Sequence, residues 1–203
     1  MSAFHPDPGE TPVAATPARL QSGHDRADSM RRILREATRG DHLSIDQAIS
    51  TLDFTDRASY RIFLAIHHAA LGHLAGRWRA QDQADFSGLL RCLAEDLRAL
   101  GSLIGFPGTP ERQRADSLRQ WGIAYVIRGS RLGGAVLRQR VPAGYPTAYL
   151  AYVPTITWPE FLNQLEHETQ AMNRPAHAQI IRGAKQAFEA FAAATATFGL
   201  RHE

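Results

Sequence analysis

The sequence predicts an all-α domain, and three observations support this prediction. Apolar residues recur at spacings of three and four beyond about residue 26, and no segment alternates apolar and polar residues as a half-buried strand does. Turn-forming clusters, such as GFPGTP at 105–110 and VPAGYP at 141–146, separate the helical stretches. Hydrophobic residues make up 44% and charged residues 21% of the chain, which suits one soluble domain with a sizeable core.

The chain divides into a tail and a helical domain. Residues 1–26 are rich in Pro, Ala, Thr, Gly and Asp without an apolar period, so we expect a disordered N-terminal tail and a helical domain over 27–203. The N-terminus lacks the apolar core of a secretory signal, and no stretch approaches the roughly 20 apolar residues of a membrane span. These features predict a cytoplasmic protein without a membrane partner.

Six to seven helices account for the periodic segments. Thr55 or Asp56 is suited to cap the second helix, and Thr157, with Pro159 in the first turn, is suited to cap the sixth. The expected helices cover about 28–49, 57–81, 84–103, 111–140, 147–153, 158–172 and 176–198.

Charge and cysteine content exclude several classes of function. The net charge is +3, and the 23 basic residues are all arginines except Lys185 and are spread along the chain. No nucleic-acid-binding motif is present, so we expect no nucleic-acid partner, although a positive excess suits an anionic small ligand. Cys92 is the only cysteine, which excludes an internal disulfide and a multi-cysteine metal site.

One of the nine histidines stands out. His42 precedes Asp46 by one helical turn, and a neutral imidazole can bind a metal with one nitrogen while the other hydrogen-bonds a carboxylate. On the residues alone, however, a single histidine on an amphipathic helix is more often structural than a ligand. We expect half-buried or surface positions for His67, His68 and His73. A di-iron site is disfavoured because the chain contains no Glu-x-x-His pair.

Three glycines interrupt the expected helix over 111–140. Each glycine inside a helix costs about 1 kcal/mol relative to alanine, so Gly129, Gly133 and Gly134 need a reason. They would allow either close packing against another helix or a bend over a flat ligand that touches bare main chain. Both explanations remain open on the residues alone.

Two segments resemble the heme oxygenase family. LREATRGDH at 34–42 is similar to the proximal-helix motif Leu-x-x-Ala-Thr-x-x-x-His, and GIAYVIRGSRLGGAVL at 122–137 is similar to the distal helix of bacterial members. The resemblance extends over about residues 28–200. It implies a heme-oxygenase-like multi-helix fold in which heme is sandwiched between a proximal helix and a kinked distal helix. It also implies oxidative cleavage of heme, as both cofactor and substrate, to biliverdin, carbon monoxide and ferrous iron.

The resemblance assigns roles on both sides of the ring. His42 matches the axial ligand of the heme iron. Gly129, Gly133 and Gly134 match the distal glycines on the oxygen-binding side. Ser130 stands where animal members carry an aspartate that organises proton-delivering water, so Ser130 with bound water is the proton route that the resemblance implies here.

Three further residues match positions near the heme propionates, namely Arg35, Tyr125 and Lys185. The chain has no flavin or nicotinamide signature, so electrons would come from an external donor such as a ferredoxin or a reductase. A biliverdin-using photoreceptor would be a further partner. The alternative function is a non-catalytic heme-binding sensor, carrier or regulatory protein on the same fold.

Overall fold

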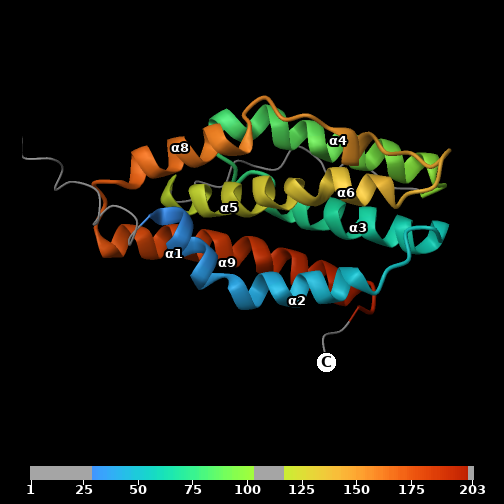
Figure 1. The fold of residues 1–203 in the computed structure, drawn as a ribbon, viewed down its shortest axis with the longest axis horizontal. Coiled ribbons are helices and arrows are strands. Elements are labelled where there is room, and N and C mark those ends of the chain that lie inside the picture. The colour runs from blue at the N-terminus through green and yellow to red at the C-terminus, as the bar shows by residue number, and fades with distance from the viewer. Residues whose placement is uncertain (1–28, 103–116, 201–203) are drawn as a thin grey trace, which may run out of the picture.

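The computed structural model describes residues 29–102 and 117–200, so the predicted tail at 1–26 lies outside the described residues. Within these two ranges every regular element is a helix, which confirms the all-α class (Figure 1). No helix in the described part of the chain is long and apolar enough to cross a membrane. The elements are α1 (Met30–Ala37), α2 (Arg39–Ser50), α3 (Arg57–Leu74), the 3-10 turn η1 (Ala80–Asp82), α4 (Gln83–Ala99), α5 (Ser117–Ser130), the 3-10 turn η2 (Arg131–Gly133), α6 (Gly134–Gln139), α7 (Ala148–Ala151), α8 (Trp158–Thr169) and α9 (Arg174–Thr197).

Side-chain caps determine where several helices begin. Asp56 accepts a main-chain hydrogen bond of 2.8 Å at the start of α3. Thr157 and Glu160 form a reciprocal capping box at the start of α8, with a proline in the first turn. Asn173 caps α9. The predicted caps Asp56 and Thr157 are therefore confirmed, because capping depends on neighbouring residues alone.

Two expected helices are interrupted. The helix predicted over 28–49 is divided into α1 and α2 at Thr38, whose hydroxyl donates to the Leu34 carbonyl at 2.8 Å. The helix predicted over 111–140 includes residues outside the described ranges, and its described part changes at Arg131–Gly133 from α5 through η2 into α6. This change of helix type falls within the predicted glycine stretch, where the glycines lower the helix propensity of the chain.

The long helix α9 connects the two helices that carry the predicted site. α1 and α2 lie along α9, and α5 packs closely against the same helix (Figure 1). α3 contacts both α9 and α4, while α8 contacts α1 and α5. The largest fully buried side chains include Tyr60, Phe63, Tyr149 and Phe161. Through these contacts α9 determines how far α2 lies from the α5–α6 segment.

The main chains of α5 and α9 approach each other at two glycines. A Cβ atom added at Gly183 would overlap the carbonyl oxygen of Arg119, and one added at Gly122 would overlap the carbonyl oxygen of Ile180. The obstructing atoms belong to the backbone and cannot rotate away, so only glycine fits at either position. Close helix packing thus operates in this protein, but at a pair of glycines other than those singled out by the sequence.

Two histidines of α3 belong to the core. His67 and His68 are buried, so the expected half-buried or surface positions are wrong for both, whereas His73 is exposed. The His67 ring centroid lies 4.3 Å from that of Phe63 and 5.4 Å from that of Tyr149, and Nδ1 lies 2.9 Å from the Phe63 carbonyl oxygen. Burial lowers the pKa of His67 to about 4. His67 is therefore a neutral core residue at pH 7.

Replacing Gly183 with alanine is expected to lower the free energy of unfolding by about 3 kcal/mol, because the added methyl group forces α5 away from α9. The matched control is Gly40→Ala in α2, where an added Cβ atom meets nothing within 4 Å. That control should change the free energy of unfolding by less than about 1 kcal/mol. Urea denaturation followed by circular dichroism measures both variants, and equal stabilities would contradict the close crossing.

Candidate functional site

His42 is held by a carboxylate one helical turn away. Its Nδ1 atom lies 2.9 Å from Oδ2 of Asp46, and 62% of the His42 side chain is exposed. The imidazole also meets the Phe188 ring of α9 edge-on, with the ring centroids 6.1 Å apart. Because Asp46 occupies Nδ1, the other nitrogen, Nε2, remains to bind a metal. The structure thus shows directly the His42–Asp46 pairing that the sequence predicts.

In the two described ranges, no three His, Cys, Asp or Glu side chains gather closely enough to hold a metal ion. A single imidazole can serve a metal complex that brings other ligands of its own. A porphyrin supplies four nitrogen ligands, so the donor set at His42 is compatible with heme.

The basic residues predicted to bind propionates lie on α1 and α9. Lys185 of α9 places Nζ 3.9 Å from Oδ2 of Asp41, the residue before His42. Both side chains are exposed, and such a pair contributes at most about 1 kcal/mol, so Lys185 can exchange this partner for another anion. Arg35 lies on α1 and is exposed.

Tyr125, the third residue predicted to bind a propionate, is half-buried. Its ring centroid lies 5.4 Å from that of Trp158. Burial raises the pKa of the Tyr125 hydroxyl, and the positive charges of Arg31 and Arg35 partly oppose this increase. The charge of Arg35 therefore acts on the Tyr125 hydroxyl, and Lys185 lies against Asp41, the residue before His42.

The three glycines of the predicted distal helix have different surroundings. A Cβ atom added at Gly133 would meet nothing within 4 Å. One added at Gly129 would make an ordinary contact of 3.6 Å with the Trp158 ring, and one at Gly134 would lie 3.3 Å from the Arg131 guanidinium. Gly133 alone of the three opens onto free space, and its φ of −78° is accessible to any residue.

Ser130 ends α5 beside these glycines. Its hydroxyl proton is used, because Oγ donates to the Ile127 carbonyl at 2.8 Å. The lone pairs of the same oxygen can still accept a hydrogen bond from water. Ser130 therefore retains the capacity to hold a water molecule.

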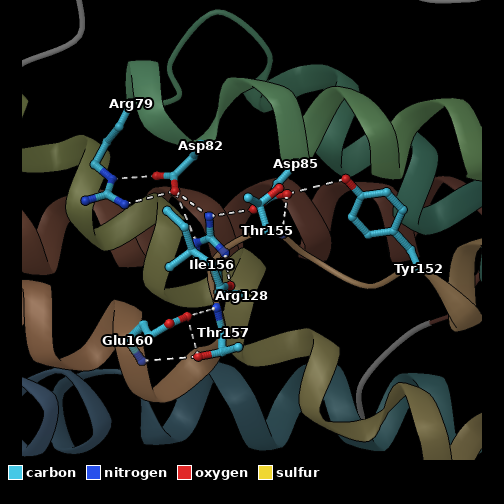
Figure 2. A network of polar contacts seen from close by, with 9 residues as sticks. All are labelled: Arg79, Asp82, Asp85, Arg128, Tyr152, Thr155, Ile156, Thr157 and Glu160. Carbon is cyan, nitrogen blue, oxygen red and sulfur yellow. Dashed lines mark hydrogen bonds and ion pairs between the residues drawn. The ribbon is translucent and has the colours of Figure 1, made fainter.

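The residue before Gly129 belongs to a buried ionic network that sequence reasoning missed (Figure 2). Arg128 donates from Nη2 to Oδ1 of Asp82 at 2.7 Å and to Oδ2 of Asp85 at 3.0 Å. Its Nη1 donates to the Ile156 carbonyl at 2.8 Å. All three charged side chains are buried. The available signal was an arginine within an apolar run together with two aspartates three residues apart.

The same network extends to the segment before α8. Arg79 donates to Oδ1 of Asp82 at 2.9 Å, and its guanidinium carbon lies 3.8 Å above the Trp121 ring. Burial raises the pKa of Asp85, but hydrogen bonds from Thr155 and Arg128 outweigh this effect, so the pKa lies below its usual value. The network therefore fixes the position of α5 immediately before its glycine stretch (Figure 2).

Comparison with known proteins bears on the fold. No protein-family model matches the chain, and no curated protein is significantly similar to it in sequence. The chain is similar in structure to the NO- and CO-bound heme oxygenase from Neisseria meningitidis, with a TM-score of 0.58 and 21% identity over 87% of this chain and 96% of that chain. The described helices therefore have the heme oxygenase fold, in agreement with the fold that the sequence resemblance implies.

Replacing Asp82 with alanine is expected to lower the free energy of unfolding by about 3–5 kcal/mol, because Arg79 and Arg128 lose a buried counter-ion. The control is Glu36→Ala, which removes an exposed ion pair of 3.0 Å with Arg32. That change should cost less than about 1 kcal/mol. Chemical unfolding measures both effects, and a small effect of Asp82→Ala would show that the network does not stabilise the fold.

Proposed function

We propose that the chain binds heme between α2 and the α5–α6 segment and cleaves it oxidatively to biliverdin, carbon monoxide and ferrous iron. The observation that carries this proposal is the His42–Asp46 pair, which leaves Nε2 of an exposed imidazole available in a chain with the heme oxygenase fold. The reaction requires O₂ and electrons from an external donor, such as a ferredoxin or a reductase.

On the α2 side, Asp46 selects the tautomer of His42. The carboxylate accepts the Nδ1 proton, so the lone pair is at Nε2, where the iron of heme would bind. Phe188 restricts the rotation of the ring from the side of α9. Bound heme would supply the iron at which oxygen is activated, and a neutral histidine as axial ligand suits oxygen binding.

At the ring edge, the residues near α1 and α9 would set the orientation of the substrate. Arg35 and Lys185 carry positive charges, and Tyr125 offers a hydroxyl, so the three can make charge-assisted hydrogen bonds to two propionates. These bonds would fix the in-plane rotation of heme. The rotation determines which ring edge faces the glycines and thus where the ring opens.

On the side of the proposed heme site opposite α2, main chain without side chains would face the ring. Gly133 leaves free space beside η2, and Gly129 adds no side chain next to Trp158. The main chain at these two glycines would therefore lie close to the oxygen-binding face of heme. Ser130 can accept a hydrogen bond from a water molecule there, and that water would deliver protons.

Replacing His42 with alanine is expected to weaken hemin binding and to change the position and intensity of the Soret band. His73→Ala is the matched control, because His73 is an exposed histidine of α3, and it should leave the Soret band unchanged. Asp46→Ala keeps the ligand but removes its orienting partner, and should reduce affinity or turnover about tenfold. Hemin titration by absorbance measures all three variants, and an identical spectrum in His42→Ala would exclude His42 as the ligand.

A hemin turnover assay distinguishes a heme oxygenase from a non-catalytic heme-binding protein. With hemin, ascorbate and O₂, the heme oxygenase proposal predicts a bilin spectrum and a biliverdin product identified by mass spectrometry. Bound heme that persists through many reduction cycles would support a carrier or sensor instead.

Replacing Gly133 with leucine is expected to block hemin uptake or turnover with the helix content preserved, because the side chain would enter the free space beside η2. The control is Ala135→Leu, which adds a comparable side chain two residues later at an exposed position of α6. Absorbance titration and circular dichroism measure binding and folding. Full activity of Gly133→Leu would mean that the ring does not lie against this glycine.

A further inference from the structure

A cavity of about 780 Å³ lies between α4, α6 and the segment 150–158. Its walls include Phe86 and Leu89 of α4 and Ala135 and Arg138 of α6. The volume falls within the range of about 300–1,000 Å³ that is typical of small-molecule sites. The cavity is therefore large enough for a drug-sized organic ligand.

This cavity borders the proposed heme site at Trp158, whose ring centroid lies 5.4 Å from that of Tyr125, but most of its wall is different. His42, Lys185 and Gly133 are not among its lining residues. Successive residues of a helix are about 100° apart, so Gly133 and Ala135 point in nearly opposite directions. The η2–α6 segment thus presents one side to the proposed heme site and another side to the cavity.

Apolar side chains dominate the cavity wall. Besides the residues of α4, the wall includes Ile156 and Trp158 from the segment that leads into α8. Leu132 and Val153 also line the cavity, and they are 59% and 83% exposed. Large aliphatic side chains that are exposed around a concave surface are typical of a binding site for an apolar ligand.

The charged groups of the wall leave a positive excess. Asp85 is neutralised by Arg128, with 3.0 Å between Oδ2 and Nη2 (Figure 2). Arg131 donates to two carbonyl oxygens of α7 at 2.7 and 3.3 Å, which do not neutralise its charge. Within the described part of the chain, its Nε atom is buried and has no hydrogen-bond partner. Arg138 adds a second, exposed cation.

We propose that this cavity binds an amphipathic organic anion, with an apolar body against α4 and a single carboxylate or sulfonate near Arg131 and Arg138. The apolar wall selects the body of the ligand, and the guanidinium groups of Arg131 and Arg138 select its charge. Binding of the anion does not require heme, because the ligand would lie on a different side of the η2–α6 segment from the proposed heme site.

The test compares two probes on the full chain without heme. 8-Anilinonaphthalene-1-sulfonate carries one sulfonate, and N-phenyl-1-naphthylamine has the same ring system without the charge. We expect the sulfonate to bind about tenfold more tightly in a fluorescence titration, because its charge can accept hydrogen bonds from a guanidinium group. Equal affinities would overturn the assignment of an anion.

Two matched pairs of variants locate the probe. Ala135→Trp fills the cavity and should weaken binding of the sulfonate at least tenfold, whereas Val136→Trp changes the next residue, which does not line the cavity, and should leave it unchanged. Arg138→Gln should weaken binding of the sulfonate but not of the uncharged probe, while Arg140→Gln should affect neither. Circular dichroism confirms that each variant is folded. Equal effects within either pair, or a larger effect of Val136→Trp, would overturn the proposal.

Discussion

The close crossing of α5 and α9 is the constraint on which the rest of the structure depends. At Gly122 and Gly183 the two main chains meet without intervening side chains, so α5 has no freedom to move toward α9. Within five residues of this crossing, α9 carries Lys185 and Phe188, which contact Asp41 and His42 of α2. A single helix therefore sets the positions of both walls of the proposed heme site.

The buried ionic network has the complementary role on the far side of α5. Charges buried without partners cost several kcal/mol each, so Arg128 keeps its place only while Asp82 and Asp85 keep theirs. This requirement fixes the last turn of α5, one residue before the glycine stretch begins. The 3-10 turn at residues 131–133 follows directly after this fixed turn. The main chain that would face the proposed ligand therefore begins at a well-defined position.

The features that could be predicted from the sequence depend on residues close together in the chain, whereas the features that were missed depend on residues far apart in it. The all-α class, the caps at Asp56 and Thr157 and the His42–Asp46 pair depend on residues within one helical turn, so local patterns indicate them. The two aspartate partners of Arg128 are more than 40 residues away, and Gly122 meets a segment about 60 residues away. A single sequence carries no record of such pairs. A buried arginine therefore resembles a surface charge until its partners are known.

The glycines of the predicted distal helix differ in how far the fold requires them. Gly122 is required by α9. A Cβ atom added at Gly134 would lie 3.4 Å from the Leu150 carbonyl oxygen and 3.3 Å from the Arg131 guanidinium, whereas one added at Gly129 would make only an ordinary contact with Trp158. Gly133 is under no such constraint, because its φ suits any residue and a Cβ atom there would meet nothing within 4 Å. Gly133 is the N-cap of α6, where glycine costs only a few tenths of a kcal/mol relative to serine or aspartate. A ligand that binds only the folded state, present at 100 times its Kd, stabilises that state by about 2.7 kcal/mol, which is enough to offset this cost.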